Sequence, residues 1–403
     1  MQDAAPGAAR EAAPVVFLLN SLQVGGSEKK MVALLGALHR RGWPVHLIYL
    51  NPPHTLLAQL DPGVPRLCLE RRGKLDWRAV RTLGAYMREH GVGSIHCVNR
   101  YPMLYGYLVA PRDDAGRRFH VYLNSTRLPN RVEEAKMLLY RLVLRRARRV
   151  VFGCRFQQSQ WLRRYRLPPE RCTYIYNGVD TARFDPLAAP RDGGGVTVGR
   201  APGELVLGMV GQCLPKKGYP DYLHALARLR AEGHPVRGLV VGDGPERARL
   251  QALAQSLGVP VHWAGELSDV RPALLAMDIF LLTSVASETF SNAALEAMAM
   301  GLPVVLSRLG GAAEMVEEGV NGHIYPAGDV ERLVARLRPL VTDPRHRARL
   351  AAAARPRVQR RFGIERMIAA YEQALGAAGM PAASAAPGAA DAGVASMGSG
   401  RQA

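Results

Sequence analysis

The chain has 403 residues, 48% of them hydrophobic, which is enough for two domains with separate cores. Its five cysteines are scattered without C-x-x-C spacing, which argues against structural zinc and favours a reduced, cytoplasmic protein. No apolar run approaches the roughly 20 residues that span a bilayer, and no signal-peptide cleavage site is expected. The net charge of +19 is compatible with a merely arginine-rich composition, or with an anionic membrane, nucleic acid or phosphorylated substrate.

Apolar strands alternate with amphipathic helices along the first half of the chain. The expected strands cover residues 15–20, 45–50, 94–99, 119–124 and 149–154, and a helix is expected over 28–42. The Ala-, Gly-, Ser- and Pro-rich ends, 1–13 and 377–403, are expected to be disordered. The Gly- and Pro-rich stretch 187–203 is typical of a linker or loop.

The alternation restarts after this linker. Strands are expected at 205–211, 237–244, 261–265, 278–283 and 303–307, with helices at 219–233 and 246–258. The pattern predicts an α/β protein with two doubly wound, Rossmann-like domains, 14–186 and 204–355, that face each other across a cleft, followed by a C-terminal helix at 356–376. Ligands of such sheets bind at the carboxyl ends of the strands.

One such strand end carries two acids, in "SVASETFSNAALEAMAMGLPVVLS". Ser291 is expected to be an N-cap, with the helix over 292–300 and Gly301 and Pro303 beyond its end. Glu288 then lies in the loop before the helix and Glu296 one turn inside it. Two carboxylates that bracket free backbone N–H groups predict a cradle for a polar ligand.

Two glycine-containing loops follow other strands. In "GGSE" (25–28) the glycines allow backbone N–H groups to approach an anion closely, although a plain turn is the alternative. In "GQCLPKKG" (211–218) a lysine pair precedes a helix, as suits a diphosphate. "VVGDGPE" lacks the G-x-G-x-x-G spacing of a dinucleotide site.

Together these stretches resemble the group 1 (family 4) retaining glycosyltransferases, which have the GT-B fold. "SETFSNAALEAMAMGLPVV" resembles the donor-binding signature of that family, with its Glu-x7-Glu spacing. The other matching stretches are "GGSE", "YIYNGVDTARFDP", "GQCLPKKG", "VVGDGPERARL" and "GGAAEMVEEGVNGHIYPAGD", in the family's order. The resemblance covers about 15–371, nearly all of the chain outside its two ends.

The resemblance implies transfer of a sugar, with retention of configuration, from a nucleoside-diphosphate sugar to a glycan or lipid-linked acceptor, in cell-surface polysaccharide or glycolipid synthesis. It implies that Glu296 binds the ribose and Glu288 the donor sugar, and that Lys217 meets the diphosphate. The other implied donor-binding residues are Gly25, Gly26, Gln212, Lys216, Phe290, Ser291 and Asn292. Lysine and helix N-termini would stabilise the charge that grows on the departing diphosphate, so no protein nucleophile and no cofactor are expected.

Two positions depart from the family pattern. Gln212 replaces the arginine of the family's Gly-Arg loop, and Lys216 could compensate. Asn124 stands where many members carry a histidine, in an acceptor region that also includes Ser125 and Arg127. His96 is therefore a catalytic candidate beside Glu288 and Lys217, and a packed or hydrogen-bonded histidine is the alternative.

No Asp-x-Asp pair occurs in the chain, so no metal site is expected. Four arginines follow a helical spacing in "AKMLLYRLVLRRARRV", namely Arg141, Arg145, Arg148 and Arg149. They suit either a solvated domain face or contact with anionic lipid at the inner face of the cytoplasmic membrane.

Three other functions remain open. A nucleotide-sugar epimerase of the same fold would need a second acid/base set, and none is identified. A non-catalytic protein that binds nucleotide-sugar would account for Gln212 and Asn124 together. A nucleic-acid-binding protein would account for the charge, but no recognised binding module is present, so no nucleic-acid partner is expected.

Overall fold

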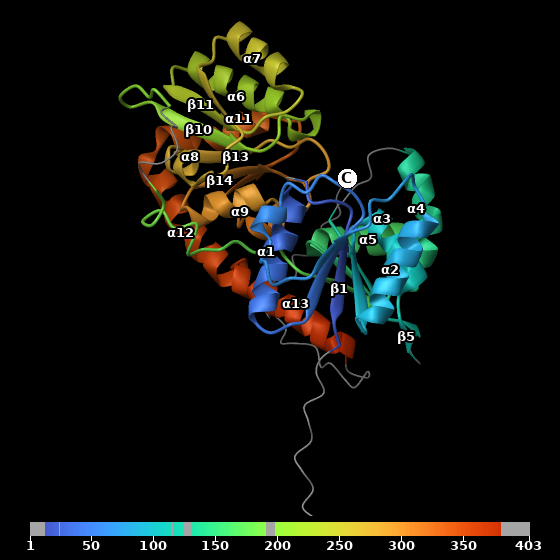
Figure 1. The fold of residues 1–403 in the computed structure, drawn as a ribbon. Helices are drawn as coiled ribbons and strands as arrows, with labels where there is room; N and C mark the ends of the chain where they lie inside the picture. The colour runs from blue at the N-terminus through green and yellow to red at the C-terminus, as the bar shows by residue number, and fades with distance from the viewer. Residues whose placement is uncertain (1–12, 24, 114–115, 125–130, 191–197, 380–403) are drawn as a thin grey trace, which may run out of the picture.

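The structure is a computed structural model that describes residues 13–23, 25–113, 116–124, 131–190 and 198–379 (Figure 1). It contains two parallel sheets of seven and six strands, one in each half of the chain. The prediction of two doubly wound, Rossmann-like units is therefore confirmed.

The first sheet has the strand order β3-β2-β1-β4-β7-β8-β9, and every neighbouring pair is parallel. Its strands are β1 (Val15–Leu19), β2 (Val45–Tyr49), β3 (Arg66–Cys68), β4 (Ser94–Val98), β7 (Phe119–Leu123), β8 (Arg149–Phe152) and β9 (Cys172–Tyr174). The central strands are buried along their whole length because helices cover both faces. These helices are α1 (Gly26–Arg40), α2 (Trp77–Glu89), α3 (Arg100–Val109), α4 (Arg131–Leu144) and α5 (Arg155–Tyr165), and β5 (Arg112–Asp113) and β6 (Gly116–Arg117) form a small hairpin.

The second sheet has the order β12-β11-β10-β13-β14-β15 and is also parallel throughout. Its strands are β10 (Leu205–Val210), β11 (Val236–Val241), β12 (Val261–Gly265), β13 (Ile279–Leu282), β14 (Val304–Ser307) and β15 (Gly322–Tyr325). Its helices are α6 (Tyr219–Ala231), α7 (Arg247–Ser256), α8 (Arg271–Leu275), α9 (Asn292–Ala299), α10 (Ala312–Met315) and α11 (Val330–Thr342). In both sheets the strand order reverses beside the first strand of the unit, which places a ligand crevice at the carboxyl ends of β1 and β10.

The C-terminal helices join the two units. Helix α12 (Pro344–Arg361) packs on α9, whereas α13 (Ile364–Gly379) packs on α1 of the first unit (Figure 1). The Tyr371 ring of α13 stacks on Tyr122 of β7, with ring centroids 5.4 Å apart. The chain thus crosses between the units twice, and the crossings pair at a bridge between Val179 and Gly363.

This arrangement corrects two predicted boundaries. Residue 356, where the C-terminal helix is expected to begin, lies inside α12, which ends at Arg361. The next helix, α13, begins at Ile364, so Phe362 and Gly363 separate the two helices. The tail expected to be disordered from 377 overlaps α13, which continues to Gly379. Beyond those residues the predicted ends lie outside the described part of the chain, as does part of the 187–203 linker. No described helix is long and apolar enough to cross a membrane.

Candidate active site

Helix α9 begins where the sequence predicted. The Ser291 hydroxyl accepts a hydrogen bond from the Ala294 amide at 3.2 Å, which makes Ser291 the N-cap. The helix ends at Ala299, one residue earlier than expected, with Met300 as its C-cap. Glu288 lies in the loop between β13 and α9, and Glu296 lies one turn inside the helix. The two acids therefore bracket a helix N-terminus.

Glu296 has an unusual electrostatic setting. Burial of its carboxyl group raises its pKa to about 7, although Lys29 and Arg183 partly oppose this shift. A carboxyl group that is partly protonated at neutral pH can both donate and accept hydrogen bonds, and its ionised form can accept one from each of two hydroxyl groups.

Glu288 is held by Lys217 and Ser284. Its Oε2 accepts from Lys217 Nζ at 2.8 Å and from Ser284 Oγ at 2.8 Å. Lys217 ends the short 3₁₀ turn Pro215–Lys217, which follows β10. Gly218 comes next with φ of 63°, and a Cβ there would lie 2.0 Å from the Thr283 carbonyl oxygen. Only glycine fits this close approach, which brings the lysine loop against the end of β13.

The glycine loop of the first unit contacts the same helix N-terminus. Asn292 Nδ2 donates to the Gly26 carbonyl oxygen at 3.1 Å. A Cβ at Gly26 would lie 3.3 Å from that nitrogen, so a larger residue would crowd the contact. Figure 1 shows α1 and α9 next to each other where the two units meet. The predicted donor-binding residues Gly25, Gly26 and Asn292 thus meet where α1 and α9 begin, and Glu288 and Glu296 lie on either side of the start of α9.

A buried lysine and two asparagines complete this junction. Lys30 Nζ donates to Asn124 Oδ1 at 3.3 Å and to Asn177 Oδ1 at 3.1 Å. Asn177 Nδ2 in turn donates to the Phe290 carbonyl oxygen at 2.9 Å and to Asn292 Oδ1 at 2.8 Å. Sequence reasoning missed Lys30 and Asn177 as site residues. One signal was available, since Lys30 is in register with Leu34 and Leu38 on the buried stripe of α1.

The remaining predicted donor residues lie around this centre. Gln212 and Lys216 are exposed on the loop after β10. The Phe290 ring is buried and stacks on Tyr176 with centroids 5.0 Å apart, so its side chain packs against the first crossing between the units. Ser125 and Arg127 lie outside the described residues.

His96 is not at a strand end. It is the third residue of β4 and is fully buried, stacked on His120 with centroids 4.4 Å apart. Its ring nitrogens are hydrogen-bonded to Ser94 Oγ and Tyr122 Oη, and burial lowers its pKa well below the usual range. Burial and these two hydrogen bonds favour the alternative, a packed or hydrogen-bonded histidine, over the prediction that His96 handles the acceptor's proton.

The basic stripe is also not a helix face. Helix α4 ends at Leu144, so only Arg141 of the four arginines is helical. Arg145 lies in the turn that follows, Arg148 precedes β8, and Arg149 is its first residue. The helical spacing breaks because the chain must turn to enter the parallel sheet, so the four arginines do not form one face of a helix.

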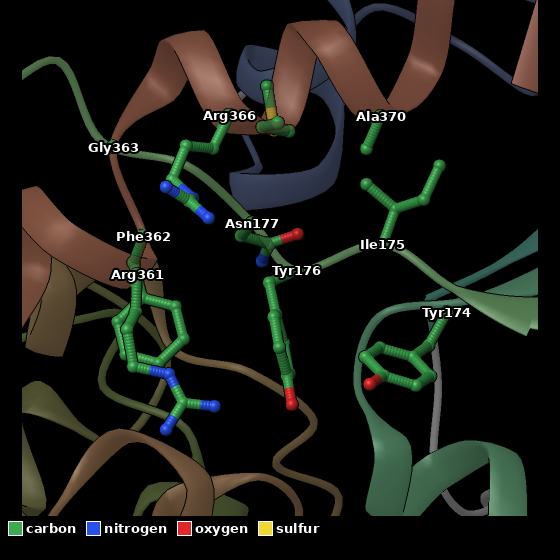
Figure 2. A pocket seen from close by; sticks show the side chains of 10 residues that line it. Tyr174, Ile175, Tyr176, Asn177, Arg361, Phe362, Gly363, Arg366 and Ala370 are labelled. Atoms are coloured by element: carbon green, nitrogen blue, oxygen red, sulfur yellow. The ribbon is translucent and has the colours of Figure 1, made fainter. Parts of the chain in front are cut away.

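A cavity of about 320 Å³ opens at the two crossings (Figure 2). Arg361 and Arg366 flank one side of it, Tyr174 lies on the other, and Tyr176 stands between them. Asn177 lines the same cavity, so the cavity adjoins the junction that Lys30 and Asn292 share. In the described part of the chain, no group of three or more His, Cys, Asp or Glu side chains could hold a metal ion.

Comparison with known proteins identifies the class. Among solved structures, the chain is similar to Anabaena Alr3699/HepE in complex with UDP and glucose, with a TM-score of 0.76, 20% identity, and coverage of 91% of this chain and 100% of that one. It is also similar to WaaG, a glycosyltransferase involved in lipopolysaccharide biosynthesis, with a TM-score of 0.67, 18% identity and coverage of 91% and 99%. The two parallel-sheet units thus have the GT-B fold.

The family follows from the sequence matches. Residues 24–183 match the model of Glycosyltransferase Family 4, and residues 197–357 match that of Glycosyl transferases group 1. The chain belongs to this family of group 1, family 4-type glycosyltransferases.

Two curated relatives illustrate its range. The lipopolysaccharide core biosynthesis glycosyltransferase LpsE of Rhizobium meliloti is 35% identical over 200 residues, 49% of this chain and 53% of that protein. The GDP-mannose-dependent alpha-(1-6)-phosphatidylinositol monomannoside mannosyltransferase of Mycolicibacterium smegmatis is 32% identical over 218 residues, 51% of this chain and 56% of that protein. The matches thus span about half the length of these relatives.

Proposed function

We propose that this protein is a retaining glycosyltransferase that moves a sugar from a nucleoside-diphosphate sugar to a glycan or lipid-linked acceptor of the cell surface. The observation that carries the proposal is the arrangement around α9, where Glu288 and Glu296 bracket a helix N-terminus that contacts the glycine loop of the first unit. The similar proteins support it, because they include Anabaena Alr3699/HepE in complex with UDP-glucose and the lipopolysaccharide core biosynthesis glycosyltransferase LpsE.

The chemistry of these residues fits such a donor. Sugar transfer leaves a nucleoside diphosphate, so negative charge grows on phosphate oxygens in the transition state. The Lys217 ammonium and the positive end of α9 would stabilise that charge. Glu296, with its raised pKa, would bind the ribose hydroxyls, and Glu288 would orient the donor sugar.

The ion pair between Lys217 and Glu288 suggests how the site works. In the structure, each charge has the other as its partner at 2.8 Å. A bound donor would offer phosphate oxygens to Lys217 and sugar hydroxyls to Glu288, so both groups could exchange a mutual contact for contacts with the substrate. The pair would thereby keep two charged side chains in place before the donor arrives.

Donor hydrolysis tests the proposal. Purified protein is incubated with UDP-, GDP- and ADP-sugars, and release of the nucleoside diphosphate is measured. Turnover of one donor supports a transferase, and NMR of the first-formed anomer in a transfer reaction reports retention or inversion. Binding without any turnover, even with acceptor extracts present, would instead favour the non-catalytic binding protein. Conversion of the free donor into its epimer would favour the epimerase.

A further inference from the structure

Lys30 carries a charge that the surrounding protein does not balance. Its side chain is only 9% exposed, and both of its hydrogen-bond acceptors are neutral amide oxygens, from Asn124 and Asn177. Within the described residues it has no ion pair. A buried ammonium without a counter-ion is costly, and such groups are uncommon unless a ligand uses them.

The acid nearest in sequence does not fill this role. Glu28 lies on the same helix and attracts Lys30 only at a distance, while its carboxylate turns back toward its own backbone amide and toward Gly25. The other elements that meet the Lys30 ammonium bring Asn124, from the end of β7, and Asn177, from the first crossing, and neither can ionise.

Two hydrogen-bond donors are left over at this point. The ammonium has three N–H groups and two acceptors among the described residues. Asn124 Nδ2 is buried and has no partner in the same part of the chain. Asn124 Oδ1 already accepts from Lys30, so turning the amide would only place a donor against a donor. One oxygen that accepts from both groups would satisfy them together.

We propose that Lys30 and Asn124 form an anion-binding subsite on the first unit's side of the junction, and that the subsite binds a phosphate oxygen of a substrate. The inference rests on the proposed function and deepens it, because it gives the first unit a phosphate-binding cation in addition to Lys217 of the second. The phosphate would belong either to the donor diphosphate or to a phosphorylated acceptor. Because Asn177 contacts both Lys30 and the Phe290 carbonyl of the second unit, phosphate entry would require Asn177 to move aside.

The pKa of Lys30 provides a readout. Burial lowers it to about 8, and only the charge of Glu28 opposes the shift. A phosphate that arrives beside Lys30 favours the charged form, so binding takes up a proton wherever Lys30 is partly neutral. At pH 8.5 the carboxyl of Glu296, with a pKa of about 7, is already ionised and contributes little. Lys30 is then mostly neutral and should take up roughly half a proton or more.

Isothermal titration calorimetry with UDP and GDP at pH 8.5, in two buffers of different ionisation enthalpy, measures that proton. We expect wild type to bind one of them with proton uptake. Lys30→Met should lose the uptake and at least tenfold in affinity. Lys74→Met, which removes the charge of an exposed lysine in the same unit, should change neither. A second arm titrates inorganic phosphate into UDP-saturated protein, and uptake confined to that arm would assign the subsite to the acceptor.

The substitution Asn124→Asp distinguishes a ligand-binding role of Lys30 from a structural one. The substitution is nearly isosteric and places a carboxylate beside the Lys30 ammonium, so thermal stability should be kept or increased. Anion affinity should nevertheless fall at least tenfold, because the new carboxylate pairs with the Lys30 ammonium and so competes with the anion. A structural role for Lys30 predicts unchanged affinity.

These results separate the two proposals. If wild type binds neither UDP nor GDP and hydrolyses no UDP-, GDP- or ADP-sugar, the proposed donor class fails. If it binds one of them, but Lys30→Met and Asn124→Asp match wild type in both arms, the subsite is refuted while the proposed function stands.

Discussion

Lys217 Nζ and Glu288 Oε2 lie 2.8 Å apart, and they join the loop after β10 to the loop after β13. Both side chains are largely buried, with 21% and 16% of their side-chain areas exposed. Under the proposed function, this pair would meet the phosphates and the sugar of a bound donor.

We expect Glu288→Gln mainly to lower kcat, by misplacing the sugar, and Lys217→Met to weaken diphosphate binding. A double-mutant cycle should show a coupling of about 1–3 kcal/mol, as for a charged hydrogen bond. Donor hydrolysis and UDP titration on the four proteins measure it. Additive effects with wild-type kcat in Glu288→Gln would remove this pair from the site.

His96 should be replaceable without loss of chemistry. His96→Phe keeps the stack on His120 and Phe17 but leaves Ser94 Oγ and Tyr122 Oη without their ring-nitrogen partner. The free energy of unfolding should fall by about 1–3 kcal/mol at pH 7. Turnover by the folded variant should remain within a few-fold of wild type, as measured at a temperature well below its Tm. A loss of a hundredfold or more with the fold intact would restore His96 as a catalytic residue.

The features predicted correctly are those that local sequence determines. Ser291, the helix after it, and the positions of Glu288 and Glu296 all follow from capping and spacing within ten residues. Lys30 could not be placed in the same way, because its acceptors are 94 and 147 residues away in sequence. The strands that hold His96 and Arg149 were expected at the right places, yet both residues were misjudged. The burial of His96 depends on rings from other strands, Phe17 and His120, which its own sequence neighbours do not reveal. Arg149 was counted on a helical stripe although it is the first residue of β8.

Chelation should leave activity unchanged. The sequence has no Asp-x-Asp pair, and the site residues are Lys217, backbone amides and two glutamates. We therefore expect donor hydrolysis in excess EDTA to match the untreated rate within about twofold, because lysine and a helix N-terminus can meet the diphosphate charge without a metal. Complete loss that Mg²⁺ or Mn²⁺ restores would show that the donor site has been misread.

Glu296→Gln should have opposite effects on stability and on binding. The pKa of Glu296 is about 7 in the folded protein, against its usual 4.5, because burial disfavours the charged form. Its contribution to stability is therefore fully present below about pH 4.5 and is lost as pH rises through 7. Above pH 7 the ionised carboxylate costs the folded state on the order of 3 kcal/mol, from 1.36 kcal/mol per pKa unit. Glutamine carries no such cost, so Tm of Glu296→Gln should exceed that of wild type at pH 8 and approach it at pH 5.

Donor binding by Glu296→Gln should weaken by about 1.5–3 kcal/mol through loss of a charge-assisted hydrogen bond to ribose. Thermal unfolding at the two pH values and titration with the donor identified by hydrolysis check both effects. A variant that is less stable than wild type at pH 8, or that binds the donor equally well, would show that Glu296 serves the fold rather than the ligand.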